Sequence, residues 1–232
     1  RHYIDVLERV KARSLPAHVS IKLTHLGLDL GRDVCAAQLR AVVARAAQLG
    51  NVVWIDMEGS KYTDVTLDLY REARRAHPNV GVCLQAYLFR TQADLDGLLP
   101  LQPTIRLVKG AYSEPPNVAY PRKKDVDTQY LRLAWRLLDA RSSQYHAPGF
   151  GTHDMRLIQQ IRDYAKAKGV PDEAYEVQML YGIRSGDQRR LAAEGARVRA
   201  LISYGSAWFV WYMRRLAERP ANVWFVVKSL FG

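Results

Sequence analysis

Two segments of this chain carry cationic side chains in a setting where an anion could be bound. In the first, Arg106 and Lys109 stand in the otherwise apolar run RLVKGAY, and Gly110 follows them. Burying cations without partners costs free energy, and a glycine lets the backbone approach a ligand closely. We therefore expect an anionic or electron-rich ligand against this run. It is not a P-loop, and the chain contains no GxGxxG, which argues against a Rossmann-type dinucleotide site.

The second segment, WFVWYMRRLAER (208–219), predicts a helix that carries the adjacent Arg214 and Arg215. Neighbouring side chains on a helix point about 100° apart, so both guanidinium groups can reach one small anion from the same turn. Two guanidinium groups can bind a carboxylate through bidentate hydrogen bonds. Glu218, four residues after Arg214, can hold that arginine in position. A solvated basic helix face is the alternative that this pattern leaves open.

Polar residues also lie at the ends of seven short runs that are apolar or rich in β-forming residues. The runs are 19–24, 52–58, 80–87, 104–110, 148–154, 175–180 and 198–204. The polar residues at their ends are Lys22, Asp56, Glu58, Gln85, Arg106, Lys109, Thr152, His153, Gln178 and Tyr204. Any one of them is explained equally well as a structural polar residue, but their convergence favours a functional site.

Amphipathic helical patterns alternate with these runs, and the alternation would bring the polar run ends together. The patterns cover 3–11, 34–49, 66–76, 125–141, 154–168 and 186–194, with Asp154 and Ser206 as N-caps and Gly50 and Gly169 at helix ends. Strand–helix alternation predicts a parallel sheet with helices outside it. In a (β/α)8 TIM-type barrel, the active site lies at the carboxyl ends of the strands.

Seven strand–helix units are one short of such a barrel. The chain opens on a helical pattern that should follow a strand, so we expect the first strand of the barrel to precede Arg1. Residues 1–232 would then form a single catalytic barrel that is incomplete at its amino terminus. A doubly wound open sheet is the alternative.

Composition places the chain among soluble globular proteins. Of its 232 residues 48% are hydrophobic and 25% are charged, and no run approaches the ~18 apolar residues of a membrane-spanning helix. No signal peptide follows Arg1, so we expect a cytoplasmic-type piece of a longer protein. Cys35 and Cys83 lie far apart in apolar surroundings, which predicts buried thiols and neither a disulfide nor a zinc site.

The net charge of +11 raises the question of a polyanionic partner. Residues 184–219 hold eight arginines against three acidic residues. That excess suits an anionic small molecule, a nucleic acid or an anionic membrane surface, and charge alone does not choose among them.

Seven ordered motifs make the chain resemble the proline dehydrogenase family over nearly its whole length, in the style of the single-function bacterial members. They are SIKLTHLGL (20–28), IDMEGS (55–60), LQAYLFR (84–90), RLVKGAYSEP (106–115), GTHD (151–154), VQMLYGIR (177–184) and YMRRLAERPAN (212–222). The resemblance implies oxidation of L-proline to Δ1-pyrroline-5-carboxylate by hydride transfer to non-covalent FAD. It also implies FAD reoxidation by a membrane quinone. It implies no metal and no nucleic acid, and it leaves open a peripheral contact with the inner face of the membrane.

The resemblance assigns substrate-binding roles to individual residues. Lys22, Arg214 and Arg215 match the residues that hold the substrate carboxylate, and Glu218 matches the acid that pairs with the two arginines. Proline must lose its ammonium proton before a hydride can leave, and the carboxylate contacts would fix the distance and angle of that transfer.

The resemblance also assigns residues to the catalytic centre and the flavin. Asp56 and Arg106 match residues beside substrate and flavin, and Leu107 and Tyr112 match residues that pack around the proline ring. The positions that match FAD contacts are Met57, Gln85, Val108, Lys109, Gly110, Thr152 and His153.

Two positions depart from the family pattern. Leu201 stands where family members commonly carry a tyrosine, and Gly151 stands where an alanine is more usual. Leu201 removes an aromatic wall or a hydrogen bond to the arginines, so it leaves open a dehydrogenase of hydroxyproline or another cyclic amine. A basic barrel that only binds, without catalysis, is the other alternative, and the intact arginine pair and flavin strand argue against it.

Overall fold

The structure is a computed structural model that describes residues 1–140 and 147–205. Its strands form one seven-stranded parallel sheet in the order β1-β2-β3-β4-β5-β6-β7. The strands are β1 (Val19–Lys22), β2 (Val53–Asp56), β3 (Val80–Gln85), β4 (Thr104–Val108), β5 (Gly149–Gly151), β6 (Glu176–Leu180) and β7 (Val198–Leu201). All seven predicted strands are confirmed, although most end before the predicted run does.

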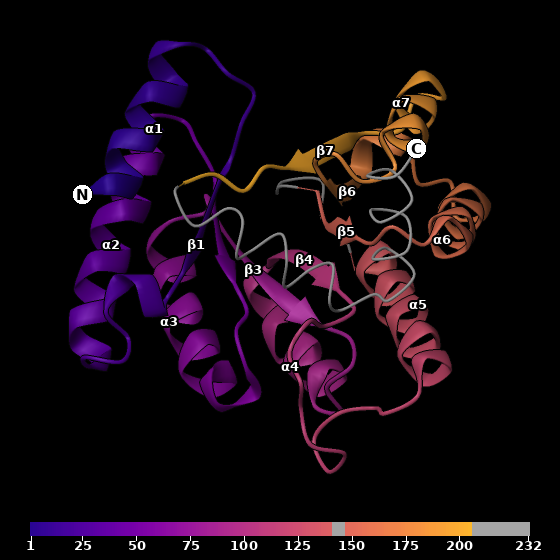
Figure 1. Cartoon of the computed structure of the whole chain (residues 1–232), viewed down its shortest axis with the longest axis horizontal. Coiled ribbons are helices and arrows are strands. Elements are labelled where there is room, and N and C mark those ends of the chain that lie inside the picture. Colours follow the sequence, from indigo (N-terminus) through magenta and orange to yellow (C-terminus); the bar gives the residue numbers. More distant parts are fainter. Residues whose placement is uncertain (141–146, 206–232) are drawn as a thin grey trace, which may run out of the picture.

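Seven α-helices connect and cover these strands. They are α1 (His2–Ala12), α2 (Arg32–Gln48), α3 (Thr63–Ala76), α4 (Thr91–Leu98), α5 (Lys123–Asp139), α6 (Met155–Ala167) and α7 (Ser185–Ala193). Figure 1 shows them arranged around the outside of the strands. Asp154 caps α6 as predicted, since its side chain accepts a hydrogen bond from the Arg156 backbone N–H. Gly50 and Gly169, with φ of +68° and +63°, follow the ends of α2 and α6.

The sheet is curled, so that side chains from distant strands meet inside it. Arg106 of β4 donates hydrogen bonds to Ser20 of β1 at 3.0 Å and to Gln178 of β6 at 2.7 Å. Arg199 of β7 donates to the Pro16 carbonyl, just before β1, at 3.2 Å. A strand order that never reverses, together with these contacts across the interior, shows a TIM-type α/β fold and excludes the doubly wound alternative.

Strand alternation separates an outer apolar layer from a polar interior. On β4, Ile105 and Leu107 are fully buried in the core that packs the sheet against the helices. Arg106 and Val108, between and beyond them, face the interior and line a cavity there. This alternation explains how an otherwise apolar strand carries an inward cation.

The predictions that concern the whole chain have different outcomes. Both cysteines are buried free thiols as predicted, and burial raises the pKa of Cys35 to about 11 and that of Cys83 to about 12. Within the described residues, no helix has the length and apolar character needed to cross a membrane. The single-domain assignment of 1–232 and the strand expected before Arg1 stay predictions.

Candidate active site

A cavity of about 240 Å³ opens at the carboxyl ends of the strands. Every one of the seven strands β1 to β7 contributes at least one lining residue. Eleven predicted site residues line it: Lys22, Asp56, Met57, Gln85, Arg106, Val108, Lys109, Gly110, Tyr112, Thr152 and His153. The fold therefore brings together side chains that are up to 131 positions apart in the sequence.

Other predicted residues lie elsewhere. The side chain of Leu107 is fully buried in the core between the sheet and the helices, so the structure does not bring it to the cavity. Glu58 accepts hydrogen bonds from the backbone and hydroxyl of Thr24 and links the loops after β1 and β2. Tyr204 is exposed and bonds to His2 at 3.0 Å. The predicted carboxylate-binding group Arg214, Arg215 and Glu218 lies outside the described residues, as does the predicted N-cap Ser206.

Arg106 is held from four directions in the cavity wall. Its Nη1 donates to Ser20 Oγ at 3.0 Å and to Asp56 Oδ1 at 2.9 Å, and its Nε donates to Gln178 Oε1 at 2.7 Å. The guanidinium lies 4.6 Å from the centre of the Trp54 ring, within cation–π range. A buried cation with this many partners is stable and has little freedom to reorient.

Among the described residues that line this cavity, Asp56 is the only one with a carboxylate side chain. Burial raises the pKa of Asp56 above its ordinary value, although the charges of Arg106 and Lys22 act in the opposite direction. A raised pKa makes a carboxylate a stronger base, so it accepts a proton more readily than an ordinary aspartate does. Asp56 is therefore suited to proton chemistry on a bound ligand.

Lys109 lies in a cluster of opposite charges at the start of α6. Its Nζ contacts Asp127 at 2.5 Å and Asp154 at 3.3 Å, and Lys123 pairs with both carboxylates as well. Burial opposes ionisation of Asp154, but Lys109 and the hydrogen bonds of Arg156 outweigh it and lower its pKa to about 2. The cluster fixes the Lys109 ammonium at the cavity wall.

Gly110 satisfies a steric requirement beside this wall. Its φ is +125°, and a Cβ at this position would lie 2.3 Å from the Tyr87 ring. The predicted close approach of the backbone is thus to an aromatic ring of the protein itself. At Gly151, the predicted departure from alanine, a Cβ would lie 2.9 Å from Val108 Cγ1, so glycine leaves that side chain its room.

Two residues that hold Arg106 in place were not predicted as site residues from the sequence. Ser20 and Trp54 each stand two positions before a predicted site residue, Lys22 and Asp56, and therefore face the same side of their strands. The period of two along a strand was the signal that could have identified them. Cys83, which lines the cavity, is an apolar position whose side chain carries no chemical signal of a site, and Leu201, the predicted departure from the family pattern, lines the cavity as well.

Comparison with known proteins places this cavity in context. A family model described as proline dehydrogenase matches residues 2–228. Proline dehydrogenase 2 of Bacillus subtilis (strain 168) is 38% identical over 227 residues, which cover 98% of this chain and 74% of that protein. Proline dehydrogenase of Deinococcus radiodurans is 40% identical over 232 residues, with coverage of 98% and 74%.

Solved structures show the same fold at lower identity. Proline utilization A from Bdellovibrio bacteriovorus superposes with a TM-score of 0.83 at 23% identity, over 92% of this chain and 27% of that one. A Bradyrhizobium japonicum protein of the same name gives a TM-score of 0.80 at 21% identity, over 92% of this chain and 25% of that one. This chain therefore spans about a quarter of those longer proteins.

Proposed function

This chain belongs to the proline dehydrogenase family, and on that premise we propose that the cavity at the carboxyl ends of the strands is where L-proline meets FAD. The family oxidises proline in the first step of proline catabolism, so the chain is an oxidoreductase and a flavoprotein. The choice of FAD, the residues that hold it and the electron acceptor are the finer parts of the proposal.

One observation carries the proposal: Arg106 is fixed in the cavity wall next to the Asp56 carboxylate, whose pKa burial raises. Arg106 and Asp56 are joined by a 2.9 Å ion pair in a wall that also holds Lys22. Such an arrangement orients a small zwitterion, because fixed charges of both signs face the same space. An ordinary structural core would fill that space with apolar side chains.

The lining residues fit a flavin. Gln85 Oε1 is buried and has no hydrogen-bond partner among the described residues, so it is available to a ligand donor such as a ring N–H or a hydroxyl. Lys109, held at the cavity wall by Asp127 and Asp154, would be the cation next to the anionic part of the cofactor. Met57 and Val108 provide apolar surface, and the Gly110 backbone lines the cavity beside them. When bound, FAD supplies the acceptor for the hydride of proline.

The chain's own residues then perform the remaining tasks. Lys22, with Arg214 and Arg215, binds the substrate carboxylate, and Glu218 orients the arginines. Tyr112, which receives a hydrogen bond from Lys22 at 3.5 Å, closes the wall beside the ring. Asp56 accepts the proton that leaves the ammonium group, since an uncharged nitrogen is required before the adjacent carbon can give up a hydride. Arg106 holds Asp56 in place and stabilises its charge.

The partners beyond substrate and cofactor follow from the same proposal. A quinone would be the electron acceptor, and the protein would act in the cytoplasm, at the inner face of the membrane. The net charge of +11 supports contact with an anionic lipid surface.

The test is the absorption spectrum of the purified protein. We expect a yellow, flavin-like spectrum that L-proline bleaches in the absence of oxygen, and acid precipitation should release FAD into the supernatant. Arg106→Met should abolish bleaching, whereas Arg190→Met, on the exposed face of α7, should leave it intact. A colourless protein, or flavin that precipitates with the protein, would contradict non-covalent FAD. Faster bleaching by hydroxyproline would favour the alternative substrate that Leu201 leaves open.

A further inference from the structure

Toward the amino ends of the strands, the barrel interior holds a second charged cluster centred on Glu176 of β6. Glu176 is 4% exposed. Arg199 of β7 binds it through two bonds, from Nε to Oε2 at 2.8 Å and from Nη2 to Oε1 at 2.7 Å. Arg197 adds a third, from Nη2 to Oε1 at 2.8 Å. Two guanidinium groups therefore hold one buried carboxylate.

These partners keep Glu176 charged. Burial alone raises the pKa of Glu176, but the hydrogen bonds and charges of Arg199 and Arg197 outweigh burial and leave that pKa below its ordinary value. In the ionised state the carboxylate only accepts hydrogen bonds. Any neighbouring amide must therefore turn its N–H toward it.

Gln178 connects this carboxylate to the cavity wall. Its Nε2 donates to Glu176 Oε2 at 3.1 Å, and its Oε1 accepts from Arg106 Nε at 2.7 Å. Since a guanidinium only donates and a carboxylate only accepts, the amide between them has one workable orientation. Gly149 of β5 makes room for it, because a Cβ there would lie 2.3 Å from Gln178 Nε2.

We infer that Glu176 is a positioning residue for proline oxidation: it fixes the Gln178 amide, which in turn fixes the Arg106 guanidinium that binds Asp56. Glu176 does not line the cavity. It therefore acts only through the hydrogen bonds that lead from Glu176 through Gln178 to Arg106, which we call the relay. The catalytic consequence rests on the function proposed above, whereas the orientation of Arg106 is a property of the protein without cofactor or substrate.

Glu176→Gln tests the relay because it keeps the shape and removes the charge. Arg199 and Arg197 would attract the one remaining oxygen, which turns the new N–H groups toward Gln178 Nε2. Gln178 must then flip and present its own N–H groups to Arg106 Nε, which also donates. The relay would break at its central link. Glu194→Gln is the matched control, since Glu194 also lies within 4.0 Å of two arginines, Arg162 and Arg190, on the surface.

The first measurement uses the flavin-free full chain labelled with nitrogen-15, with the Arg106 Nε–H resonance assigned by its loss in Arg106→Lys. We expect slow solvent exchange of this proton in the wild type and in Glu194→Gln. In Glu176→Gln and in Gln178→Leu the resonance should shift and exchange at least about tenfold faster. An unchanged resonance in folded Glu176→Gln would overturn the inference, whether or not the protein oxidises proline.

The second measurement is kinetic and uses the flavin-loaded protein. Glu176→Gln should lower kcat about tenfold or more and change the KM for proline by less than about threefold. In a Gln178→Leu background the same substitution should have almost no further effect, because the relay is already broken. Additive losses in this double-mutant cycle would mean that Glu176 acts only on stability and would overturn the inference.

Arg199→Lys covers the case in which Glu176→Gln does not fold. Lysine keeps the positive charge but cannot reproduce the two-pronged grip on the carboxylate. We expect a smaller shift of the Arg106 resonance and a smaller loss of kcat than in Glu176→Gln. A lower melting temperature with the resonance unmoved would show a purely structural ion pair and refute the relay.

Discussion

At the scale of single residues, the most informative signal in this chain is a charge where the surrounding sequence is apolar. Arg106 stands within an apolar strand, and the structure gives it four partners and a place in the cavity wall. Burial of an arginine is tolerated only with such partners. A cation of this kind therefore indicates a site from the sequence alone, because the fold must supply its counter-charges.

The neighbouring Leu107 shows where residue-level reasoning reaches its limit. The family resemblance places Leu107 beside the substrate ring, but its side chain packs on the opposite side of the strand from Arg106. Consecutive residues of a strand point to opposite faces, so Arg106 and Leu107 cannot both line the cavity through their side chains.

The predicted arginine pair supplies the sharpest test at this scale. Arg214→Met and Arg215→Met should each raise the KM for proline about ten- to a hundredfold, since each loses a charge-assisted hydrogen bond of about 1.5–3 kcal/mol. Flavin content should stay near that of the wild type, and lysine substitutions should restore only part of the affinity.

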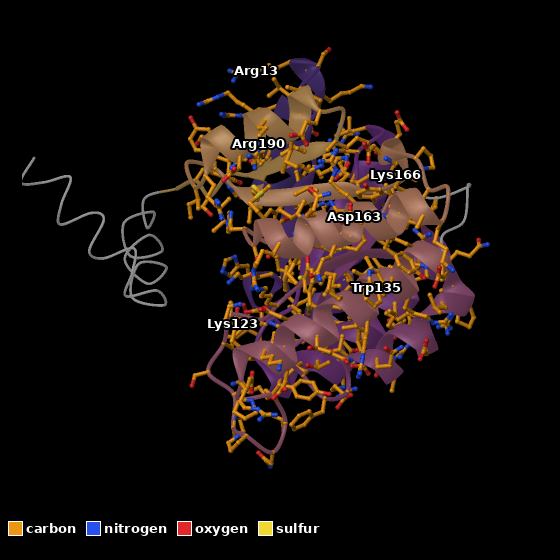
Figure 2. The ribbon with its side chains drawn as sticks, turned by 90° about the vertical axis from the view of Figure 1, so that its right-hand side faces the viewer. Arg13, Lys123, Trp135, Asp163, Lys166 and Arg190 are labelled. Carbon is orange, nitrogen blue, oxygen red and sulfur yellow. The ribbon has the colours of Figure 1, made fainter. Side chains whose placement is uncertain are left out.

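The control for this pair is Arg190→Met. Arg190 is an exposed arginine of α7 (Figure 2), and its carboxylate partners are Asp187 in the same helix and Glu194 directly after it. We expect its removal to leave KM unchanged. Wild-type KM values in both Arg214→Met and Arg215→Met, measured on folded yellow protein, would reduce the pair to a solvated basic helix face.

At the scale of elements, the strands were predictable because each is an apolar run with a polar end. The helix α4 was not, since its eight residues, TQADLDGL, include Gly97 and are too short for a clear helical period. Predicted strands also ran too long, because the apolar pattern continues past the last paired residue. In the second strand, for example, Met57 still faces the cavity although β2 ends at Asp56.

Gly81 and Gly97 make a matched pair of glycines in a strand and a helix. A Cβ on Gly81 would lie 2.6 Å from the Trp54 ring and 3.1 Å from the Thr104 carbonyl, whereas a Cβ on Gly97 would meet only Arg71 Nη2 at 4.0 Å. Gly81→Ala should lower the free energy of unfolding by about 1–3 kcal/mol through overpacking. Gly97→Ala should raise it by about 0.5–1 kcal/mol, because alanine favours the helix. Urea unfolding measures both, and equal signs would refute the steric argument.

Asp154 combines a helix cap with an ion pair, and two substitutions separate these roles. The folded protein holds the pKa of Asp154 at about 2, below that of an unfolded aspartate near 4, so its ionic contribution to stability is present above about pH 4. That contribution is lost as the pH falls toward 2. Asp154→Asn keeps the cap and should flatten the acid part of the stability profile, whereas Asp154→Ala should lose about 1 kcal/mol more at neutral pH.

Asp163 is the control for this prediction. It lies on the exposed side of α6 (Figure 2), where its hydrogen-bond partner is Gln159 of the same helix. Asp163→Asn should leave the acid part of the unfolding profile as steep as in the wild type. If Asp154→Asn also leaves the acid part of the profile as steep as in the wild type, the ion pair with Lys109 contributes nothing to the free energy of unfolding at low pH.

At the scale of the whole molecule, the sequence predicted the alternation of strands and helices but not the interior of the barrel. Trp54, Glu176 and Arg199 form that interior with Arg106, yet none of the first three follows from composition or periodicity alone. The contacts of Arg106 join β4 to β2 and β6, which are not its neighbours in the sheet and are brought to it by the curl, whereas Glu176 and Arg199 lie on the paired strands β6 and β7. Local patterns cannot report such pairings, because the partners lie dozens of positions apart.

The same curl predicts that the cofactor stabilises the molecule as a unit. The residues proposed to hold FAD lie on or directly after β2, β3, β4 and β5, so the bound cofactor would bridge several strands of the one curled sheet. At a free concentration about a hundredfold above its dissociation constant, FAD should add about 2.7 kcal/mol to the free energy of unfolding. For a chain of this size that corresponds to a rise of about 5–10 °C in Tm.

Hydrogen exchange distinguishes stabilisation of the whole sheet by FAD from stabilisation of only the strands next to it. With FAD, amide protection should rise in β1 and β6 as well as in β3 and β4, because a ligand that bridges several strands of one sheet suppresses opening of the whole sheet. Riboflavin, which lacks the phosphates that Lys109 is proposed to bind, should protect the same strands less at equal concentration. Protection confined to β3 and β4, with no change in Tm, would mean that the flavin rests on one side of the cavity and that the curled sheet does not close around it.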